Sequence, residues 1–237
     1  MPLDLEARSP MQCDMSQTLI LCLHEVTRAA PASPWAVNDR VLDRLIGDLA
    51  DAGWALVSLE DVADPRPRRF VLTLDDARSG AVAWLLSSGT EARATIFPIP
   101  LFIESPDRIP AQELYSGFCD YEQLAAARAR GHAIGSHGMT HRPLPELPFD
   151  DAERELRESR ARLETVFGAP VDRLALPFGK YSDEVIALAR AAGYRQVFNT
   201  RREINTDADV AAGFLNRMAL RSDRERMGLP EALFQGP

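Results

Sequence analysis

The stretch Phe70-Val-Leu-Thr-Leu-Asp75-Asp76 is a run of apolar and β-branched residues that ends in two adjacent carboxylates. Such a run predicts a buried strand, and because side chains alternate along a strand, the two carboxylates at its end can serve different tasks. In parallel α/β folds, ligands bind at the carboxyl ends of the strands, so Asp75 and Asp76 are candidate site residues. The structural alternative is that Asp76 is the N-cap of a helix that includes residues 81–86.

Seven further short runs predict strands, and most of them are separated from the next by a predicted helix. These runs are residues 19–23, 55–59, 94–97, 133–136, 174–176, 196–199 and 217–220. Helices are predicted over residues 41–49, over 124–130 after a cap at Asp120, over 152–167, and from a cap at Ser182 to Gly193. Strands that alternate with helices predict an α/β fold whose parallel sheet is covered by helices, and at this point a barrel and an open sheet are both open.

No break in composition, long linker or internal repeat divides the sequence, so a single domain is expected over residues 18–230. Residues 1–17 are interpreted as an N-terminal extension. The last residues, Glu231-Ala-Leu-Phe-Gln-Gly-Pro237, closely resemble the recognition site of a viral protease that is used to remove tags. Residues 231–237 are therefore interpreted as a tail of engineered origin and are left out of the fold prediction.

The composition excludes several classes of protein. The chain has 237 residues, of which 46% are hydrophobic and 26% charged, and this excludes a collagen, a coiled coil or a disordered tail. The net charge of −8 opposes the binding of nucleic acid, so no nucleic-acid partner is expected. The longest apolar run, residues 81–86, is far shorter than the ~20 residues that a helix needs to cross a bilayer, so no membrane span is expected.

The cysteines and the N-terminal residues indicate the cellular location that is expected for the protein. Cys13, Cys22 and Cys119 form no Cys-x-x-Cys spacing and cannot all pair, which favours a reducing compartment. The opening residues lack the basic segment and the long apolar core of a signal peptide. The cytoplasm is therefore the expected location, and export is the alternative if a signal was removed from the chain.

A second cluster, Gly131-His-Ala-Ile-Gly-Ser-His137-Gly-Met-Thr-His141, is again a short apolar run that leads into polar residues. In a helical turn, residues four apart lie on one face, so His137 and His141 can offer nitrogens to one cation, as zinc sites require. The alternative is that one or both are hydrogen-bonded structural histidines. His132 precedes the strand, at the end opposite the candidate site, and is predicted to be structural.

A third cluster, Leu174-Ala-Leu-Pro177-Phe178-Gly179-Lys-Tyr181, is a strand that meets a Pro and Gly turn. Such a turn can expose backbone N–H groups and form an oxyanion hole, and the alternative is an ordinary strand-to-helix turn. Pro177 and Tyr181 are candidate substrate-binding residues. Four prolines between residues 98 and 110 predict a long irregular loop that faces the substrate.

The order and content of these clusters resemble the polysaccharide deacetylase superfamily, the metal-dependent carbohydrate esterases that include chitin, chitooligosaccharide and peptidoglycan deacetylases. The resemblance covers roughly residues 19–200. Leu21-Cys-Leu-His24-Glu-Val is similar to the opening strand of the family, and Trp54-Ala-Leu-Val-Ser-Leu-Glu-Asp to the segment before its first catalytic motif. Thr73-Leu-Asp-Asp76 resembles its Thr-Phe-Asp-Asp motif, and Ser136-His-Gly-Met-Thr-His141 its His-x-x-x-His motif.

The resemblance implies a deformed (β/α)7 barrel in which Asp76, His137 and His141 hold one divalent metal ion. Zinc is the expected metal, with cobalt, nickel, iron and manganese as alternatives. The resemblance also implies that Asp75 is the general base and that the backbone N–H of Phe178 stabilises the oxyanion.

The implied activity is the hydrolysis of an N-acyl group, with acetyl expected, from an amino sugar in a glycan, a glycolipid or a sugar precursor. The partner is thus a carbohydrate or a small glycoside. Two alternatives are a cyclic imide or ureide amidohydrolase of the same superfamily, and a carbohydrate-binding relative with weak catalysis.

The sequence departs from the family pattern in three places. Ala77 follows the Asp pair where many members have Gly, and Ala175 stands where many have an Arg that orients the base. No histidine follows His141 to supply the general acid.

His24 is the candidate acid, because it ends the strand 19–23 and so lies on the same rim as the other clusters. A carboxylate, from Glu25 or a site aspartate, is expected to raise the pKa of His24. The alternative is that His24 orients Asp75 or a substrate hydroxyl.

Overall fold

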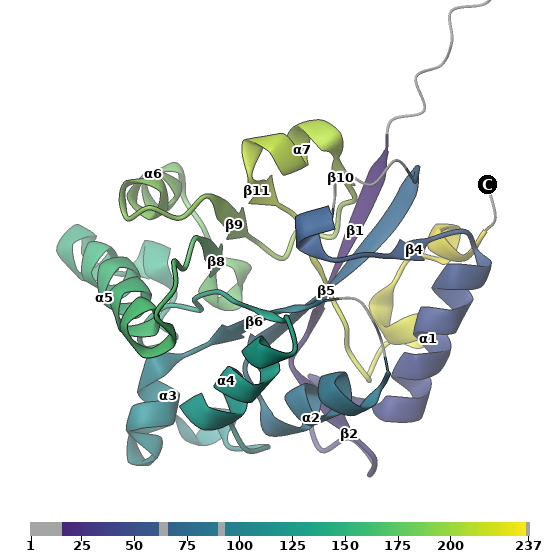
Figure 1. Ribbon diagram of the computed structural model, residues 1–237, viewed down its shortest axis with the longest axis horizontal. Coiled ribbons are helices and arrows are strands. Elements are labelled where there is room, and N and C mark those ends of the chain that lie inside the picture. Colours follow the sequence, from purple (N-terminus) through teal and green to yellow (C-terminus); the bar gives the residue numbers. More distant parts are fainter. Residues whose placement is uncertain (1–15, 62–65, 90–92, 236–237) are drawn as a thin grey trace, which may run out of the picture.

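A sheet of mostly parallel strands runs through the middle of the molecule in the computed structural model, which describes residues 16–61, 66–89 and 93–235 (Figure 1). Its strand order is β10-β1-β5-β6-β7. In addition, β12 pairs with β1, and β4 pairs with β5. The strands are β1 (Gln17–Leu23), β4 (Ala55–Leu56), β5 (Arg68–Asp76), β6 (Thr95–Pro98), β7 (Ala133–Ile134), β10 (Asn205–Thr206) and β12 (Met218–Ala219). β10 is antiparallel to β1, and the other pairs are parallel.

A second parallel sheet completes the ring. It consists of β8 (Arg173–Ala175), β9 (Gln196–Phe198) and β11 (Phe214–Leu215). A parallel bridge between Ser136 and Leu174 joins β8 to the end of β7, and two residues connect β11 to β12. The strands therefore close irregularly, and the deformed single-domain barrel predicted above is confirmed. A separate parallel pair, β2 (Glu25–Thr27) and β3 (Ala36–Asn38), lies at the rim.

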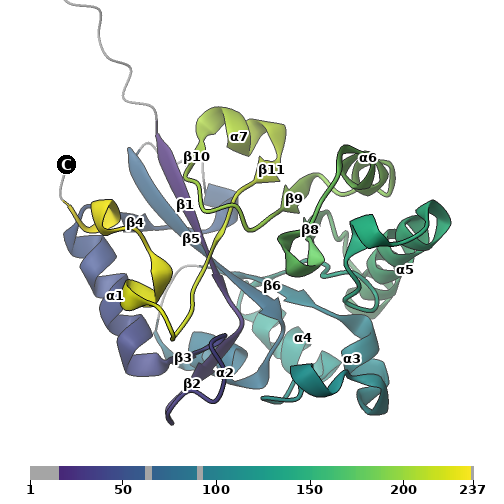
Figure 2. The same ribbon diagram turned by 180° about the vertical axis from the view of Figure 1, so that it is seen from behind.

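Helices cover the outside of the strands, as Figures 1 and 2 show from opposite sides. They are α1 (Asp39–Asp51), α2 (Ser79–Ser87), α3 (Pro100–Glu104), α4 (Tyr121–Ala129), α5 (Phe149–Phe167), α6 (Asp183–Ala191) and α7 (Asp207–Ala212). Both predicted caps are confirmed: Asp120 forms a capping box with Gln123, and Ser182 accepts from the Val185 N–H. Gly168 ends α5 in the left-handed conformation that glycine adopts without steric cost.

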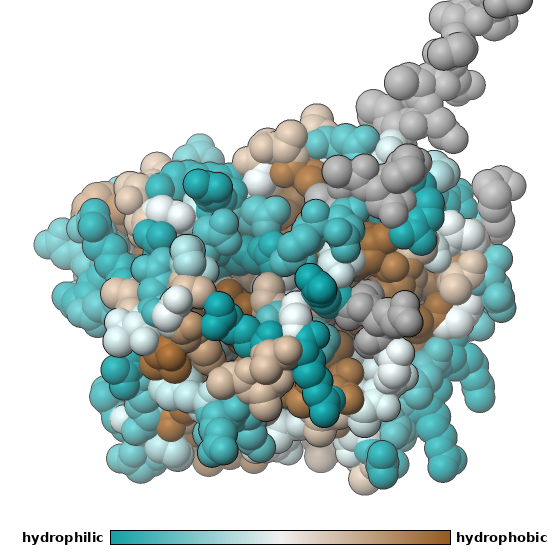
Figure 3. Space-filling model, in the orientation of Figure 1, coloured by the Kyte–Doolittle hydropathy of each residue, from teal (hydrophilic) through white to brown (hydrophobic). Residues whose placement is uncertain are grey.

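The apolar side chains alternate between two cores, as expected for strands that are buried on both faces. Ile20, Val71, Phe97 and Phe198 belong to a small cluster, whereas neighbouring strand residues such as Leu19 belong to the larger cluster that includes the helices. On the face of Figure 3, hydrophilic residues predominate and apolar residues form small groups. No helix in the described part of the chain is both long and apolar enough to cross a membrane.

Several local predictions differ from the structure. The segment after Pro98 is not an irregular loop throughout, because residues 100–104 form α3 and short 3-10 turns follow. The predicted strand 55–59 ends at Leu56, and a 3-10 turn follows at Leu59–Asp61. His132 is structural, as predicted, since its Nδ1 accepts from the Ala94 N–H at 3.2 Å. Residues 1–15, which include Cys13 and most of the N-terminal extension, lie outside the described residues, and Cys22 and Cys119 are free and buried.

Leaving the C-terminal tail out of the fold was wrong. Glu231–Phe234 forms a 3-10 turn in which Leu233 is buried. The Trp54 indole N–H donates to the Leu233 carbonyl at 2.8 Å, and the Arg226 guanidinium lies 4.3 Å from the centre of the Phe234 ring. Residues 231–235 therefore pack on the domain, and their engineered origin stays a prediction.

Leu233→Ala should lower the free energy of unfolding by about 2–5 kcal/mol, since the substitution leaves a cavity beside Trp54. Chemical denaturation followed by Trp fluorescence measures this loss. Gln235→Ala, at an exposed position of the same tail, should change the free energy by less than about 0.5 kcal/mol. Equal stability of Leu233→Ala and the wild type would show that the tail does not contribute to the core.

Candidate active site

The chain turns sharply where β5 ends. Asp76 and Ala77 both adopt positive φ, 65° and 56°, although neither is glycine. A left-handed residue with a Cβ costs about 1–2 kcal/mol, so packing must stabilise this turn, and Ala77 is fully buried. Position 77 thus has the conformation that a glycine there would favour, and Ala adopts it at this cost. Helix α2 has Arg78 as its N-cap residue, so the alternative that Asp76 caps this helix is wrong.

Asp76, His137 and His141 converge on one point. Asp76 Oδ1 lies 3.6 Å from His137 Nε2 and 3.8 Å from His141 Nε2. Oδ1 is buried and has no hydrogen-bond partner among the described residues. Zinc ligands lie 2.0–2.2 Å from the ion, so two of them are ~3.3 Å apart, close to the distances found here. An unpartnered buried oxygen that faces two imidazole nitrogens fits a shared cation.

The backbone presents the two histidines in an unexpected way. The spacing suggested a helical turn over residues 137–141, but these residues do not form one. Gly138 and His141 have positive φ, 77° and 61°, and the bends bring the ring centres of His137 and His141 to 4.9 Å. The prediction that the two rings lie together is confirmed, but the predicted backbone conformation, a helical turn, was wrong.

Both histidines present Nε2 to Asp76, but their pKa values are shifted in opposite directions. His137 Nδ1 lies 2.8 Å from the Ala175 carbonyl, which only accepts, so Nδ1 carries the proton and Nε2 is free. Burial lowers the pKa of His137 to about 4, so the ring is neutral at neutral pH. The pKa of His141 is raised, because the nearby carboxylates of Glu113 and Asp76 outweigh the effect of burial.

Asp75 is held by an arginine that the sequence analysis missed. Arg217, fully buried, donates from Nη1 to Oδ1 at 2.6 Å and from Nη2 to Oδ2 at 2.8 Å. Although burial acts in the opposite direction, Arg217 holds the pKa of Asp75 well below its usual range. Arg217, the residue before β12, therefore compensates for the absence of an arginine at position 175. The only signal in the sequence was a single arginine that begins the last predicted strand.

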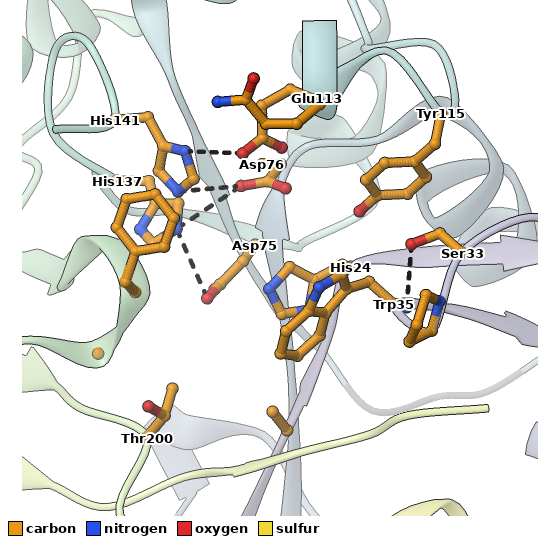
Figure 4. Close-up of a pocket in the computed structure, with 15 residues that line it drawn as sticks. His24, Ser33, Trp35, Asp75, Asp76, Glu113, Tyr115, His137, His141 and Thr200 are labelled. Carbon is orange, nitrogen blue, oxygen red and sulfur yellow. Dashed lines mark hydrogen bonds and ion pairs between the residues drawn. The ribbon is translucent and has the colours of Figure 1, made fainter. Parts of the chain in front are cut away.

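His24 lies beside Asp75, on the other side from the two candidate metal-binding histidines (Figure 4). Its ring centre is 4.8 Å from that of Trp35, and its Nδ1 is buried with no hydrogen-bond partner among the described residues. Burial lowers the pKa of His24. The site carboxylates Asp76 and Asp75 act to raise it, as expected, but burial outweighs them, so the expected net rise does not occur. Glu25 Oε1 instead accepts from the adjacent Val26 N–H at 2.7 Å.

The turn after β8 supplies a free donor but not the expected side chains. Phe178 has a φ of 59°, and no acceptor for its N–H is found in the described part of the chain. Its ring, 55% exposed, stacks on His141 with the centres 4.6 Å apart. Pro177 and Tyr181 do not line the cavity, because Pro177 is buried and Tyr181 faces Phe214 at 5.0 Å after the chain has turned.

These groups surround one cavity of about 470 Å³ (Figure 4). Among the lining residues that sequence reasoning missed are Trp35, Glu113, Tyr115 and Thr200. Trp35 lies between β2 and β3, and Glu113 and Tyr115 lie in residues 109–118, which we call the Glu113 loop. Glu113 and Tyr115 lie far from any strand end and so carry no sequence signal of this kind. Thr200 follows the end of β9, and its place after that strand could have identified it.

Fold and site together define an α/β barrel with a candidate metal centre at the carboxyl ends of its strands. The sequence profile of the family described as Polysaccharide deacetylase matches residues 63–197, more than half of the chain. The chain belongs to the polysaccharide deacetylase family. Membership makes it a deacetylase, that is, a hydrolase of the carbohydrate-esterase type that acts on saccharides.

Solved structures of similar fold have low sequence identity to this chain. The Streptococcus pyogenes deacetylase PplD in complex with acetate is 19% identical with a TM-score of 0.73, and 90% of this chain and 96% of that chain are covered. IcaB from Ammonifex degensii is 20% identical with a TM-score of 0.75, covering 88% and 93%. A de-N-acetylase from Aggregatibacter actinomycetemcomitans is 17% identical with a TM-score of 0.70, covering 86% and 94%. At these identities, the likeness shows the fold.

Arg217→Met should lower the free energy of unfolding by about 3–5 kcal/mol, because it leaves Asp75 buried without its counter-charge. Adding Asp75→Asn removes that charge and should recover part of the loss, with a coupling energy of about 0.5–3 kcal/mol in a double-mutant cycle from urea denaturation. Arg157→Met, which breaks an exposed pair with Glu153, should cost less than about 1 kcal/mol. Strict additivity of the two site substitutions would contradict the assigned pair.

Proposed function

We propose that the protein binds one divalent ion, zinc in the first instance, through Asp76, His137 and His141 and removes N-acetyl groups from amino sugars. The unpartnered, buried Asp76 Oδ1 between two imidazole nitrogens is the observation that carries this proposal. A bound divalent ion supplies Lewis acidity, which acidifies a water molecule and polarises a carbonyl oxygen. Three protein ligands are typical of catalytic zinc sites, which keep a position open.

Asp75 is the proposed general base. Its Oδ2 lies 3.7 Å from His137 Nε2, so the carboxylate borders the metal position without replacing Asp76. Because Arg217 lowers its pKa, Asp75 is ionised throughout the neutral range and can accept a proton from the attacking water.

The Phe178 N–H is the proposed oxyanion donor. It has no acceptor in the described structure and lies in a turn that borders the cavity. A preorganised donor of this kind typically contributes about 3 kcal/mol to the stabilisation of the transition state. The left-handed conformation of Phe178 commits the backbone to this orientation before substrate binds.

An N-acetyl amino sugar in a short saccharide or a sugar precursor is the proposed substrate. The cavity is of the size of small-ligand pockets, and its walls include the rings of Trp35 and Tyr115, which offer apolar faces to a sugar. The names of two similar proteins support the acyl group, since one is a de-N-acetylase and another was solved with acetate. The cytoplasmic location stays a prediction.

His141→Ala should abolish stoichiometric Zn²⁺ binding, because it removes one of three ligands. Metal content after dialysis, measured by mass spectrometry, and acetate release from chitooligosaccharides test this. A chelator should abolish acetate release by the wild type, and Zn²⁺ should restore it.

Asp75→Asn is the matched variant for that experiment. It should retain the metal and lose about 100-fold to 10,000-fold in turnover, the usual contribution of a general base. Full metal occupancy and activity in both His137→Ala and His141→Ala would refute the proposed centre.

His24 is proposed as the general acid, with the orienting role as the alternative. His24→Gln should bind metal normally and, if His24 is the acid, lose more turnover on an N-acetyl substrate than on an activated ester, whose leaving group needs no proton. Because the pKa of His24 is lowered from its ordinary 6.5, an acid role also requires amide turnover that falls as pH rises through a value below 6.5. Equal losses on both substrates would assign His24 to positioning.

A further inference from the structure

A buried guanidinium joins the candidate metal centre to the Glu113 loop. Arg78, fully buried, donates from Nε to Asp76 Oδ2 at 3.0 Å and from Nη2 to Glu113 Oε2 at 2.7 Å. Its Nη1 donates to the Glu113 carbonyl at 2.9 Å, and its guanidinium carbon lies 3.8 Å from the centre of the Tyr115 ring. Arg78 therefore fixes both the backbone and the carboxylate of Glu113.

The other oxygen of Glu113 faces a proposed metal ligand. Oε1 lies 3.6 Å from His141 Nδ1, and His141 Nε2 in turn lies 3.8 Å from Asp76 Oδ1. Figure 4 shows Glu113 on the side of His141 that is turned away from Asp75. Asp76, Arg78, Glu113 and His141 thus form a closed ring of contacts in which each residue touches the next.

Backbone pairing gives this ring a fixed frame. The Ser79 N–H donates to the Gly117 carbonyl at 3.0 Å, and the Cys119 N–H donates to the Ala77 carbonyl at 2.9 Å. Arg78 and Phe118 form an antiparallel bridge between these two bonds. The Glu113 loop is therefore attached to the turn after β5 by its main chain as well as by its side chains.

We propose that Glu113 is a positioning residue for the metal ligand His141, and that Arg78 holds Glu113 and Asp76 in register. The proposal rests on the metal centre proposed above. Glu113 Oε1 faces Nδ1 at 3.6 Å, an ion-pair contact that favours a proton on Nδ1 and so the tautomer in which Nε2 is free to bind. Arg78 occupies Asp76 Oδ2 and leaves Oδ1 as the oxygen that faces the two imidazoles.

The test measures metal affinity rather than activity. Zn²⁺ is titrated into the metal-free protein by calorimetry against a competing chelator at one pH. Glu113→Gln, which keeps the shape and removes the charge, should raise the Kd for Zn²⁺ about 10-fold to 100-fold, the usual cost of losing such a partner. The absorption spectrum of the Co²⁺-loaded protein should change as well, because the orientation of His141 relaxes.

Glu146→Gln is the control, since it removes the same charge from an exposed residue that pairs with Lys180. Its Kd should equal that of the wild type. If Glu113→Gln does not fold, Glu113→Asp replaces it: this variant keeps the charge, is one methylene shorter, and should also raise the Kd.

The outcomes separate the two proposals. If the wild type binds Zn²⁺ and the Glu113 variant binds it with the same Kd, the positioning role is overturned and the proposed metal centre is retained. Equal losses in the Glu113 and Glu146 variants would indicate a general effect of charge and would also overturn it. No Zn²⁺ binding by the wild type would instead refute the proposed function.

Discussion

Two adjacent carboxylates at the end of β5 are each held by a different buried arginine, and the arrangement of the site depends on this division. Arg217, the residue before β12, engages both oxygens of Asp75, whereas Arg78, in the turn after β5, engages one oxygen of Asp76. A buried ion pair is costly to break, because the remaining charge is left without a partner. The first pair therefore ties the last strand to the middle of the sheet, and the second ties the turn to the Glu113 loop. What remains free is a single oxygen, Asp76 Oδ1, at the centre of the site.

Backbone strain gathers around the same centre. Four non-glycine residues at the cavity or next to it have positive φ, namely Asp76, Ala77, His141 and Phe178. Each such residue costs about 1–2 kcal/mol, and the surrounding packing must supply that energy. These left-handed bends orient the site: they point the side chains of Asp76 and His141 toward one position and leave the Phe178 N–H without an acceptor. Ordinary strand geometry would have turned neighbouring side chains to opposite faces.

The fold and the central residues could be predicted from the sequence because their signals are local. Alternating strands and helices gave the parallel architecture, and the Asp pair and the two histidines marked the carboxyl ends of their strands. Contacts between distant residues had no such signal. The Asp75–Arg217 pair spans 142 positions, and Glu113 reaches His141 only because the loop is pinned to Arg78.

The errors have the same origin. Spacing predicted that the rings of His137 and His141 meet, but not the bends that bring them together. A nearby carboxylate suggested a raised pKa for His24, whereas tertiary packing buries the ring against Trp35 and lowers it. Tyr181 was assigned to the site from its place in the motif, and the turn at Phe178 directs it elsewhere.

The departure at Ala175 follows from the same packing. Ala175 belongs to the small core cluster with Phe97 and Phe198, and these two rings lie 5.5 and 5.8 Å from the Arg217 guanidinium. A long side chain at position 175 would compete for the volume that the guanidinium fills, so a small residue there and an arginine at 217 are complementary. The Ala175 carbonyl meanwhile fixes the tautomer of His137. Position 175 thus orients a metal ligand through its backbone and, by having almost no side chain, leaves room for the arginine that holds the base.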